Sequence, residues 1–216
     1  IGTSYMNGLR NPTLYEMFGT DNFGYSGNKN LKPEKSNTYE IYSNLVLSNN
    51  ANFSIRAFKS NIKNNIEYIN NKYQNDTDEV DLNQSGISNN LNIKLKDAKL
   101  KLFSSFLSSK KENGSDQLRR PEKNYGINFS KIIGNSLFGD LNINLNYNHY
   151  GKHFDTHSTN FSTIEMDSTD IVDLKISKKF NNSVFFIKTT NLLNETYQRP
   201  HGYNQDNRII KFGMKY

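Results

Sequence analysis

The clearest pattern in the chain is the regular alternation of apolar and polar residues between Leu141 and Tyr150. Leu141, Ile143 and Leu145 alternate with asparagines, so a strand here has one apolar face and one polar face. A soluble sandwich also uses strands of this kind, with the apolar face turned inward. The pattern therefore predicts a two-faced β-strand, and its recurrence elsewhere decides the class of fold.

Similar alternation recurs along the whole chain and predicts about ten strands, each close to the length that a tilted strand needs to cross a bilayer. The expected strands are Ile1–Met6, Ser36–Leu47, Phe53–Ile69, Ile87–Lys96, Lys99–Ser108, Tyr125–Phe129, Leu141–Tyr150, Val172–Ile176, Val184–Thr190 and Ile210–Tyr216.

The connections between these strands alternate between short and long. The expected short turns are Ser48–Asn50, Asp97-Ala98, Gly134-Asn135 and Asn181-Asn182. The expected long polar loops are Asn7–Lys35, Asn70–Asn83, Lys110–Pro121, Gly151–Asp167 and Leu193–Asn207. Tight turns on one side and long loops on the other are typical of an antiparallel transmembrane β-barrel, which we favour over a soluble β-protein.

Composition narrows the classes of protein further. Only 34% of the 216 residues are hydrophobic, and no stretch approaches the length of a membrane-spanning helix. A polar average suits a barrel, because alternate residues face a wet lumen. The aromatic content of 12% argues against disorder, and the absence of cysteine excludes disulfides and thiolate chemistry.

The formal net charge of +6 changes this interpretation little. Nucleic-acid binding requires basic residues clustered on one face, whereas these lysines mostly alternate with apolar residues along strands, as in Leu91–Lys96. We therefore expect no nucleic-acid partner. The first residues lack the basic and apolar regions of a signal peptide, so we interpret Ile1 as an internal position of a longer protein.

The chain contains three distinctive motifs. The first, residues 10–18, includes Arg10, Pro12, Leu14 and Tyr15; the second, residues 27–36, includes Asn30, Leu31, Pro33, Glu34 and Ser36; the third, residues 191–197, includes Asn191, Leu192 and Tyr197. Together these motifs resemble those of the TonB-dependent outer-membrane receptors. From the residues alone, these positions suit strand ends and turns without ligand contact, since proline restrains the chain before a strand and asparagine tolerates left-handed backbone.

The resemblance implies one domain, residues 1–216, which forms the C-terminal part of a barrel of the 22-stranded type, without the N-terminal plug. It implies a multi-pass protein of the outer membrane of a Gram-negative bacterium, in contact with lipid and lipopolysaccharide. The TonB–ExbB–ExbD complex would supply energy through the missing plug. Neither enzymatic activity nor a cofactor is implied.

The sequence around residues 118–121 and 202–208 looks like the cobalamin transporters of this family, so cobalamin or a related corrinoid is the expected ligand. A ferric siderophore is the alternative, because variable loops determine the ligand specificity. Haem is disfavoured, since residues 13–27 contain no histidine. The loop residues that we expect to contact ligand are Tyr25, Tyr73, Arg120, His153 and Tyr203.

Other sites are weaker. His149, His153 and His157 follow one another at intervals of four, but His149 ends a strand, so they do not share a helix face. The acidic residues Asp76–Asp81 lack the glycine spacing of an EF-hand. We expect no metal site. A self-contained porin or an outer-membrane protease with an Asp/His pair remains as an alternative.

Overall fold

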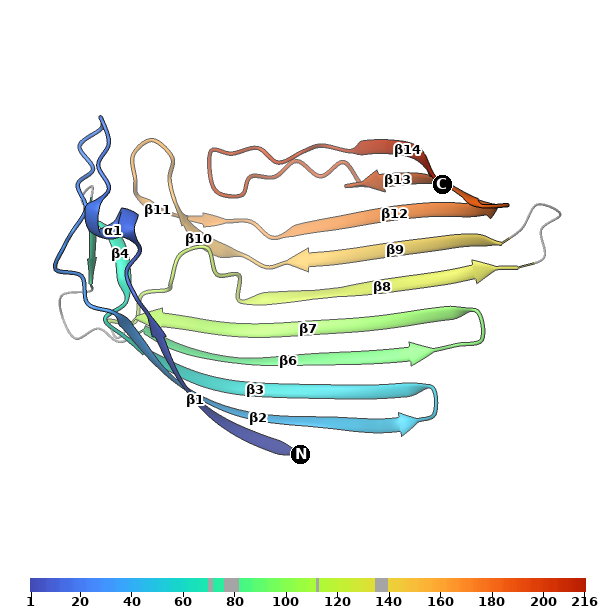
Figure 1. The fold of residues 1–216 in the computed structure, drawn as a ribbon, viewed down its shortest axis with the longest axis horizontal. Coiled ribbons are helices and arrows are strands. Elements are labelled where there is room, and N and C mark those ends of the chain that lie inside the picture. Colours follow the sequence, from blue (N-terminus) through green and yellow to red (C-terminus); the bar gives the residue numbers. More distant parts are fainter. Residues whose placement is uncertain (70–71, 76–81, 112, 135–139) are drawn as a thin grey trace. The chain divides into compact units, whose positions relative to one another are not determined.

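The computed structural model describes residues 1–69, 72–75, 82–111, 113–134 and 140–216 (Figure 1). Most elements are antiparallel strands, and one short helix follows the first strand. The elements are β1 (Gly2–Arg10), α1 (Leu14–Phe18), β2 (Glu34–Ser48), β3 (Ala51–Lys63), β4 (Ile66–Ile69), β5 (Lys72–Asn75), β6 (Leu82–Lys94), β7 (Ala98–Lys111), β8 (Lys123–Ile133), β9 (Leu141–Tyr150), β10 (His153–Thr156), β11 (Thr163–Met166), β12 (Thr169–Phe180), β13 (Ser183–Thr190) and β14 (Ile209–Lys215).

Ten of these strands form one antiparallel sheet in the order β1-β2-β3-β6-β7-β8-β9-β12-β13-β14. The remaining four form two separate hairpins, β4–β5 and β10–β11. Neighbours in the sheet are therefore also neighbours along the chain, apart from these inserted hairpins. This arrangement confirms the predicted all-β fold class with an antiparallel sheet of about ten strands.

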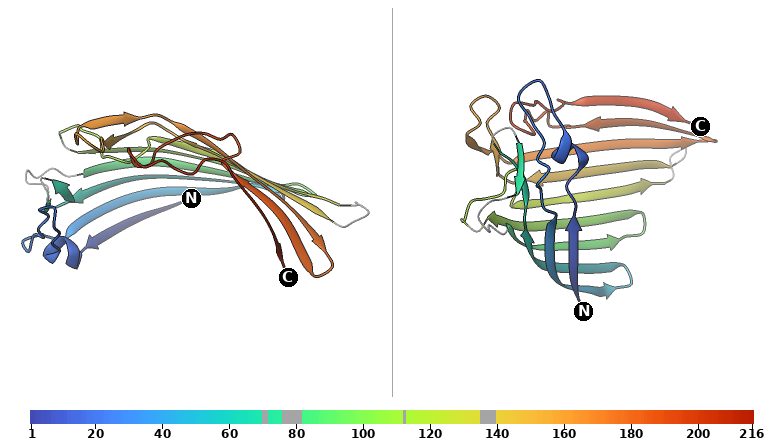
Figure 2. Two further views of the ribbon diagram at one scale, coloured as in Figure 1. Left: turned by 90° about the horizontal axis from the view of Figure 1, so that it is seen from above. Right: turned by 60° about the vertical axis from the view of Figure 1, so that its left-hand side comes forward.

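The chain divides into two compact units. The first comprises Ile1–Tyr42, Arg56–Gly86 and Ser108–Gln117, and the second comprises Ser43–Ile55, Ile87–Leu107 and Leu118–Tyr216. Within the second unit, β12, β13 and β14 run side by side in both views of Figure 2. No helix in the described ranges is long and apolar enough to cross a membrane.

Two of the predicted short turns are confirmed. β2 and β3 are joined by Asn49 and Asn50, and β12 and β13 by Asn181 and Asn182. Asn181 has a φ of 51°, a left-handed conformation that asparagine tolerates better than most residues. In the turn expected at Gly134-Asn135, Asn135 lies outside the described residues.

Several strand boundaries differ from the prediction, and two of these differences have a local cause. The connection between β6 and β7 comprises three residues, 95–97, and Ala98 already belongs to β7, because the Leu95 N–H donates to the Ala98 carbonyl at 2.8 Å. The return strand expected to reach Ile69 ends at Lys63, because Asn64 adopts a φ of 55° and redirects the chain into the β4–β5 hairpin.

Four expected loops also contain regular structure, and one of them, Asn70–Asn83, contains β5 and the start of β6. β1 continues to Arg10, which pairs in register with Glu34, and α1 follows within the segment expected to be a loop over Asn7–Lys35. β7 extends to Lys111, and the segment Gly151–Asp167 contains the β10–β11 hairpin, so His153 lies in a strand. Short elements of this kind depend on tertiary contacts more than on sequence period.

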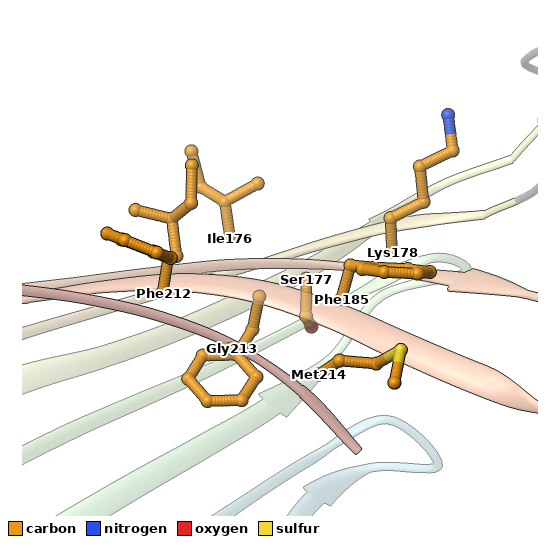
Figure 3. A pocket seen from close by; sticks show the side chains of 9 residues that line it. Ile176, Ser177, Lys178, Phe185, Phe212, Gly213 and Met214 are labelled. Carbon is orange, nitrogen blue, oxygen red and sulfur yellow. The ribbon is translucent and has the colours of Figure 1, made fainter. Parts of the chain in front are cut away.

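The sheet of the second unit has one apolar face. The register places Ile143, Ile176, Ile187 and Phe212 in a single row across β9, β12, β13 and β14. Figure 3 shows Ile176, Phe185 and Phe212 on the same side of the sheet. Phe212 is 85% exposed and Ile187 is 54% exposed. These apolar side chains are not covered by other described parts of the chain.

The opposite face of the same strands is polar. The row Asn128–Asn146–Asp173 crosses β8, β9 and β12 in register. The apolar residues buried among the described residues all belong to the first unit, namely Tyr25, Leu31, Ile66 and Leu82. The described part of the second unit therefore lacks the buried apolar core that a soluble sandwich would have, because its apolar side chains lie uncovered on one face of the sheet.

Candidate functional site

A cavity of about 320 Å³ lies in the second unit, beside the long-loop ends of β8 and β9. Its walls come from the start of β8, the end of β9, β10 and the connections that precede β8 and β14. It is lined by Arg119, Pro121, Asn124, Tyr150, His153, Asp155, Arg199 and Pro200. On their strands, Asn124 and Tyr150 pair in register and belong to the polar face of the sheet.

Asp155 is the best-satisfied polar group of this cavity. It is fully buried, and its Oδ1 accepts hydrogen bonds from Arg119 Nε and from the Thr156 N–H, each at 2.7 Å. Its Oδ2 accepts the His201 N–H at 2.8 Å. Burial alone would raise the pKa of Asp155, but these hydrogen bonds outweigh it and hold the pKa below its usual value. One carboxylate thus fixes three loop segments.

Arg199 is in the opposite situation. Its guanidinium lies over the ring of Tyr150 at 4.2 Å and over that of Tyr197 at 5.6 Å, as cation–π contacts require. Its Nε is buried and has no hydrogen-bond acceptor among the described residues. The buried Oδ1 of Asn124, on the same cavity wall, likewise has no donor there. The cavity therefore offers an unsatisfied cationic donor and an unsatisfied acceptor.

The histidines near this cavity do not converge on a metal site. The Nδ1–H of His149 donates to Asp170 Oδ1 at 2.8 Å, and the ring of His149 stacks on that of Tyr125, on the apolar face. His153 is buried and contacts the Gly151 carbonyl, whereas the rings of His157 and His201 lie tilted against each other with their centroids 4.4 Å apart. No group of three potential ligands from His, Cys, Asp and Glu occurs within the described ranges. The acidic residues Asp76–Asp81 lie outside those ranges.

In the first unit, the first two sequence motifs meet in a network of charges. Arg10 Nη1 donates to Glu16 Oε1 at 3.1 Å, and Arg10 Nε donates to Glu34 Oε2 at 2.7 Å. Thr13 and Glu16 form a capping box at the start of α1, and Glu34 also accepts the Ile66 N–H at 2.8 Å. Burial raises the pKa of Glu16, but the hydrogen bonds from Thr13 and Arg10 lower it further than burial raises it.

Four tyrosines form a second cluster of the first unit, comprising Tyr15, Tyr25, Tyr68 and Tyr73. Tyr25 is only 4% exposed, and its hydroxyl donates to the Tyr15 carbonyl at 2.5 Å. Burial is the main reason that the pKa values of Tyr25 and Tyr73 are raised. Tyr25 thus packs inside a loop instead of standing at an exposed tip.

The remaining motif residues organise loops. Asn191, with a φ of 52°, donates its side-chain amide to the carbonyls of Glu195 and Asp206 and accepts the Glu195 N–H. The Leu192 N–H donates to the Val172 carbonyl on β12, and the Tyr197 carbonyl accepts the Gln205 N–H. The other motif positions vary in exposure: Leu31 is buried, Pro12, Pro33 and Ser36 are half-buried, and Leu14 and Asn30 are exposed.

Among the five expected ligand contacts, His153 alone lines the cavity. Arg120 is exposed and follows the cavity residue Arg119, and Tyr203 is 67% exposed in the segment after Pro200. Tyr25 and Tyr73 belong to the tyrosine cluster of the first unit. Sequence reasoning did not identify Asn124 or Arg199 and did not place Asp155 at a ligand site, because local sequence does not indicate which connections meet.

Comparisons with known proteins support this architecture. A family model described as TonB dependent receptor-like, beta-barrel matches residues 2–194. No curated protein sequence matches the chain significantly. Among solved structures, the ferripyoverdine receptor of the outer membrane of Pseudomonas aeruginosa aligns with a TM-score of 0.75 at 16% identity, covering 98% of this chain and 30% of that one.

Two further structures align in the same way. The siderophore receptor PirA from Acinetobacter baumannii has a TM-score of 0.77 at 15% identity, covering 99% of this chain and 38% of that one. The ferric yersiniabactin uptake receptor FyuA from Yersinia pestis has a TM-score of 0.71 at 16% identity, covering 98% and 32%. This chain spans 30% to 38% of the length of these three proteins. By its family match and its strand order, the chain belongs to the TonB-dependent receptor-like β-barrel family.

Proposed function

We propose that this chain forms the C-terminal barrel part of an outer-membrane receptor that takes up a ferric siderophore by TonB-dependent transport. The observation that carries the proposal is an antiparallel sheet with an uncovered apolar face, in a chain of the TonB-dependent receptor-like family. Residues 1–216 then act as one barrel domain. The plug and its contacts with TonB–ExbB–ExbD belong to parts of the receptor outside this chain.

The two faces of the sheet support a location in the bilayer. Leu145, Ile187 and Phe212 lie on the apolar face, where hydrocarbon would solvate them, and the asparagines and lysines of the other face would line a wet interior. The short turns would then lie on the periplasmic side and the long loops outside. Lipid and lipopolysaccharide would contact the apolar face.

The cavity favours an anionic ligand. Arg199 has no carboxylate partner among the described residues, and its Nε lacks an acceptor. The iron-chelating oxygens of siderophores, from hydroxamate, catecholate or carboxylate groups, are hydrogen-bond acceptors that carry negative charge and suit such a guanidinium. The three structures named above are described as receptors for siderophores or for their ferric complexes. This supports a ferric siderophore over the cobalamin expected from the sequence.

A binding titration on the purified full-length receptor tests this proposal. Ferric hydroxamate, ferric catecholate and cyanocobalamin are titrated separately and their binding is measured by calorimetry. We expect saturable binding of one ferric chelate and energised uptake that is lost in cells without TonB. Binding of cyanocobalamin alone would contradict the choice of ligand, and uptake independent of TonB would contradict the transport mechanism.

A further inference from the structure

Two histidines bring together two long connections of the second unit. His157 begins the connection between β10 and β11, residues 157–162, and His201 lies in the connection between β13 and β14, residues 191–208. Their half-buried rings lie tilted against each other with centroids 4.4 Å apart. The Ser158 N–H also donates to His201 Nδ1 at 3.1 Å, across 43 positions of the sequence. We call His157 and His201 the histidine pair.

The hydrogen bonds of the histidine pair require both rings to be neutral. A backbone N–H only donates, so His201 Nδ1 accepts from Ser158 and carries no proton. His157 Nδ1 likewise accepts the Thr159 N–H at 3.3 Å. Each imidazole therefore carries its single proton on Nε2. In this arrangement the pair offers no free lone pair to a metal ion, and the addition of a proton to either Nδ1 removes a hydrogen bond.

Glycine at position 202 allows the two connections to approach each other closely. Gly202 has a φ of 86°, and a Cβ placed on it would lie 2.6 Å from the Cβ of Ser158. The same segment reaches the cavity, because Arg199, which lines it, lies two residues before His201. The His201 N–H donates to Asp155 on β10 at 2.8 Å. Both the His201 backbone and the histidine pair therefore hold the connection that carries Arg199 against the β10–β11 hairpin.

The carboxylates near the histidine pair already have cationic partners. On β10, Asp155 pairs with Arg119, which belongs to the connection before β8. On β11, Glu165 pairs with Lys152. The other titratable groups of the hairpin and of the two connections are His153, Asp167, Glu195, Tyr197, Arg199, Tyr203, Asp206 and Arg208. Neither histidine of the pair forms an ion pair with a carboxylate among the described residues, so an imidazolium here would have no counter-charge in direct contact.

We propose that the histidine pair is a proton-sensitive contact, which holds the connection that carries Arg199 against the β10–β11 hairpin at neutral pH and releases it in mild acid. A proton on His201 Nδ1 turns this acceptor into a donor that faces the Ser158 N–H, and two imidazolium rings with centroids 4.4 Å apart repel each other. The ordinary pKa of histidine is about 6.5, so a contact that requires neutral rings is present above that pH and is lost as the pH falls.

The consequence for ligand binding rests on the proposed function. Arg199 is held in place partly by the histidine pair, so its release makes the guanidinium less well positioned for a ligand. The cavity should therefore bind its ferric siderophore less tightly below about pH 6 than at neutral pH.

Hydrogen exchange in the purified full-length receptor without ligand tests the contact itself. After correction for intrinsic rates, we expect the Ser158 amide to exchange at least several-fold faster at about pH 5.5 than at about pH 7.5, because its acceptor is a histidine nitrogen. The His201 amide should stay protected at both values, because its acceptor is the Asp155 carboxylate. An unchanged rate at Ser158 would overturn the proposal.

Three variants assign the response to the histidine pair. His201→Asn should keep the protection of Ser158 at both pH values, because its amide oxygen takes the place of Nδ1 and does not titrate. His149→Asn is the matched control, since His149 donates to Asp170 outside both connections, and it should respond to acid like the wild type. Gly202→Ala should expose the Ser158 amide at both pH values, because its Cβ displaces Ser158. An acid response that persists in His201→Asn would overturn the proposal.

Calorimetric titration of the same preparations with a ferric hydroxamate tests the effect on the cavity. The affinity of the wild type should fall several-fold between about pH 7.5 and about pH 5.5, and that of His201→Asn should fall less. Both proteins meet the same chelate at the same pH, so an effect of acid on the chelate itself is equal for both. Equal losses of affinity would overturn the effect on the cavity. If no ferric chelate binds at either pH while the Ser158 amide responds to acid, the proposed function fails and the proton-sensitive contact stands.

Discussion

Two charged residues that line the cavity of the second unit, Asp155 and Arg199, differ in how completely their neighbours satisfy their hydrogen-bonding groups. The carboxylate of Asp155 accepts from Arg119, Thr156 and His201, so it has little capacity left for a ligand. The guanidinium of Arg199 is held by stacking on Tyr150, and its Nε remains without an acceptor among the described residues. At the scale of single residues, Asp155 therefore builds the cavity and Arg199 is the group available to a ligand.

Replacing Arg199 tests whether this residue contacts the ligand. Arg199→Ala removes the donors and the positive charge, and hydrogen bonds to charged groups contribute about 1.5–3 kcal/mol. We expect the affinity of the full-length receptor for its ferric siderophore to fall about 10- to 100-fold in a calorimetric titration. Arg208→Ala is the matched control, because Arg208 belongs to the same connection between β13 and β14 but does not line the cavity. Equal affinities of the two variants would contradict the assignment.

The lowered pKa of Asp155 predicts how the loops respond to acid. A carboxylate whose pKa is lower in the folded state stabilises that state above the unfolded pKa, about 3.9 for Asp, and this stabilisation disappears as the pH falls through the folded pKa. We expect the backbone amides of Thr156 and His201 to lose protection against hydrogen exchange below about pH 4, after correction for intrinsic rates.

Asp155→Asn should remove this acid transition and raise exchange at these amides about 10- to 100-fold at neutral pH, because charge-assisted hydrogen bonds are lost. Asp167→Asn provides the control, since Asp167 is 94% exposed in the same connection between β9 and β12. An acid transition that persists in Asp155→Asn would show that another group controls the loops.

At the scale of elements, the two faces of β9 should differ in their tolerance of charge. Leu145 pairs with Phe129 and Leu174 on the apolar face, whereas the adjacent Asn144 pairs with Ser130 and Lys175 on the polar face. Leu145→Arg should destabilise the full-length receptor by about 2–4 kcal/mol, because its charge would lie in hydrocarbon. Asn144→Arg should reduce the stability of the receptor much less, because its charge would lie on the polar face. The free energies of unfolding of both variants, folded into lipid vesicles, are measured by urea titration. Equal decreases for the two variants would mean that the apolar face does not contact lipid.

The same elements show what a sequence can reveal. β9 matches its predicted bounds, Leu141–Tyr150, because alternation over ten residues is a strong local signal. The four-residue strands β4, β5, β10 and β11 have no comparable signal. Their positions depend on long-range contacts such as that of Glu34 with Ile66, and on left-handed residues such as Asn64.

The candidate site was harder to predict for the same reason. Arg119, Asp155 and Arg199 come from three separate connections or hairpins, and local sequence does not indicate which loops meet. The motif residues were easier to interpret. Arg10 forms ion pairs with Glu16 and Glu34, so these three residues of the first two motifs contact one another.

At the scale of the whole molecule, the strand order leaves β1 and β14 with one hydrogen-bonded neighbour each within the described residues. An unpaired backbone group in hydrocarbon costs several kcal/mol, so a sheet with two such edges should be unstable in a bilayer. We expect residues 1–216, produced alone and offered to lipid vesicles, to form mixed oligomers, whereas the full-length receptor should give a monomeric band whose electrophoretic mobility changes on heating. A protease-resistant monomer of residues 1–216 would contradict this expectation, because it would require β1 to pair with β14 in a closed ten-stranded barrel. Such a barrel would favour the porin and protease alternatives over a receptor.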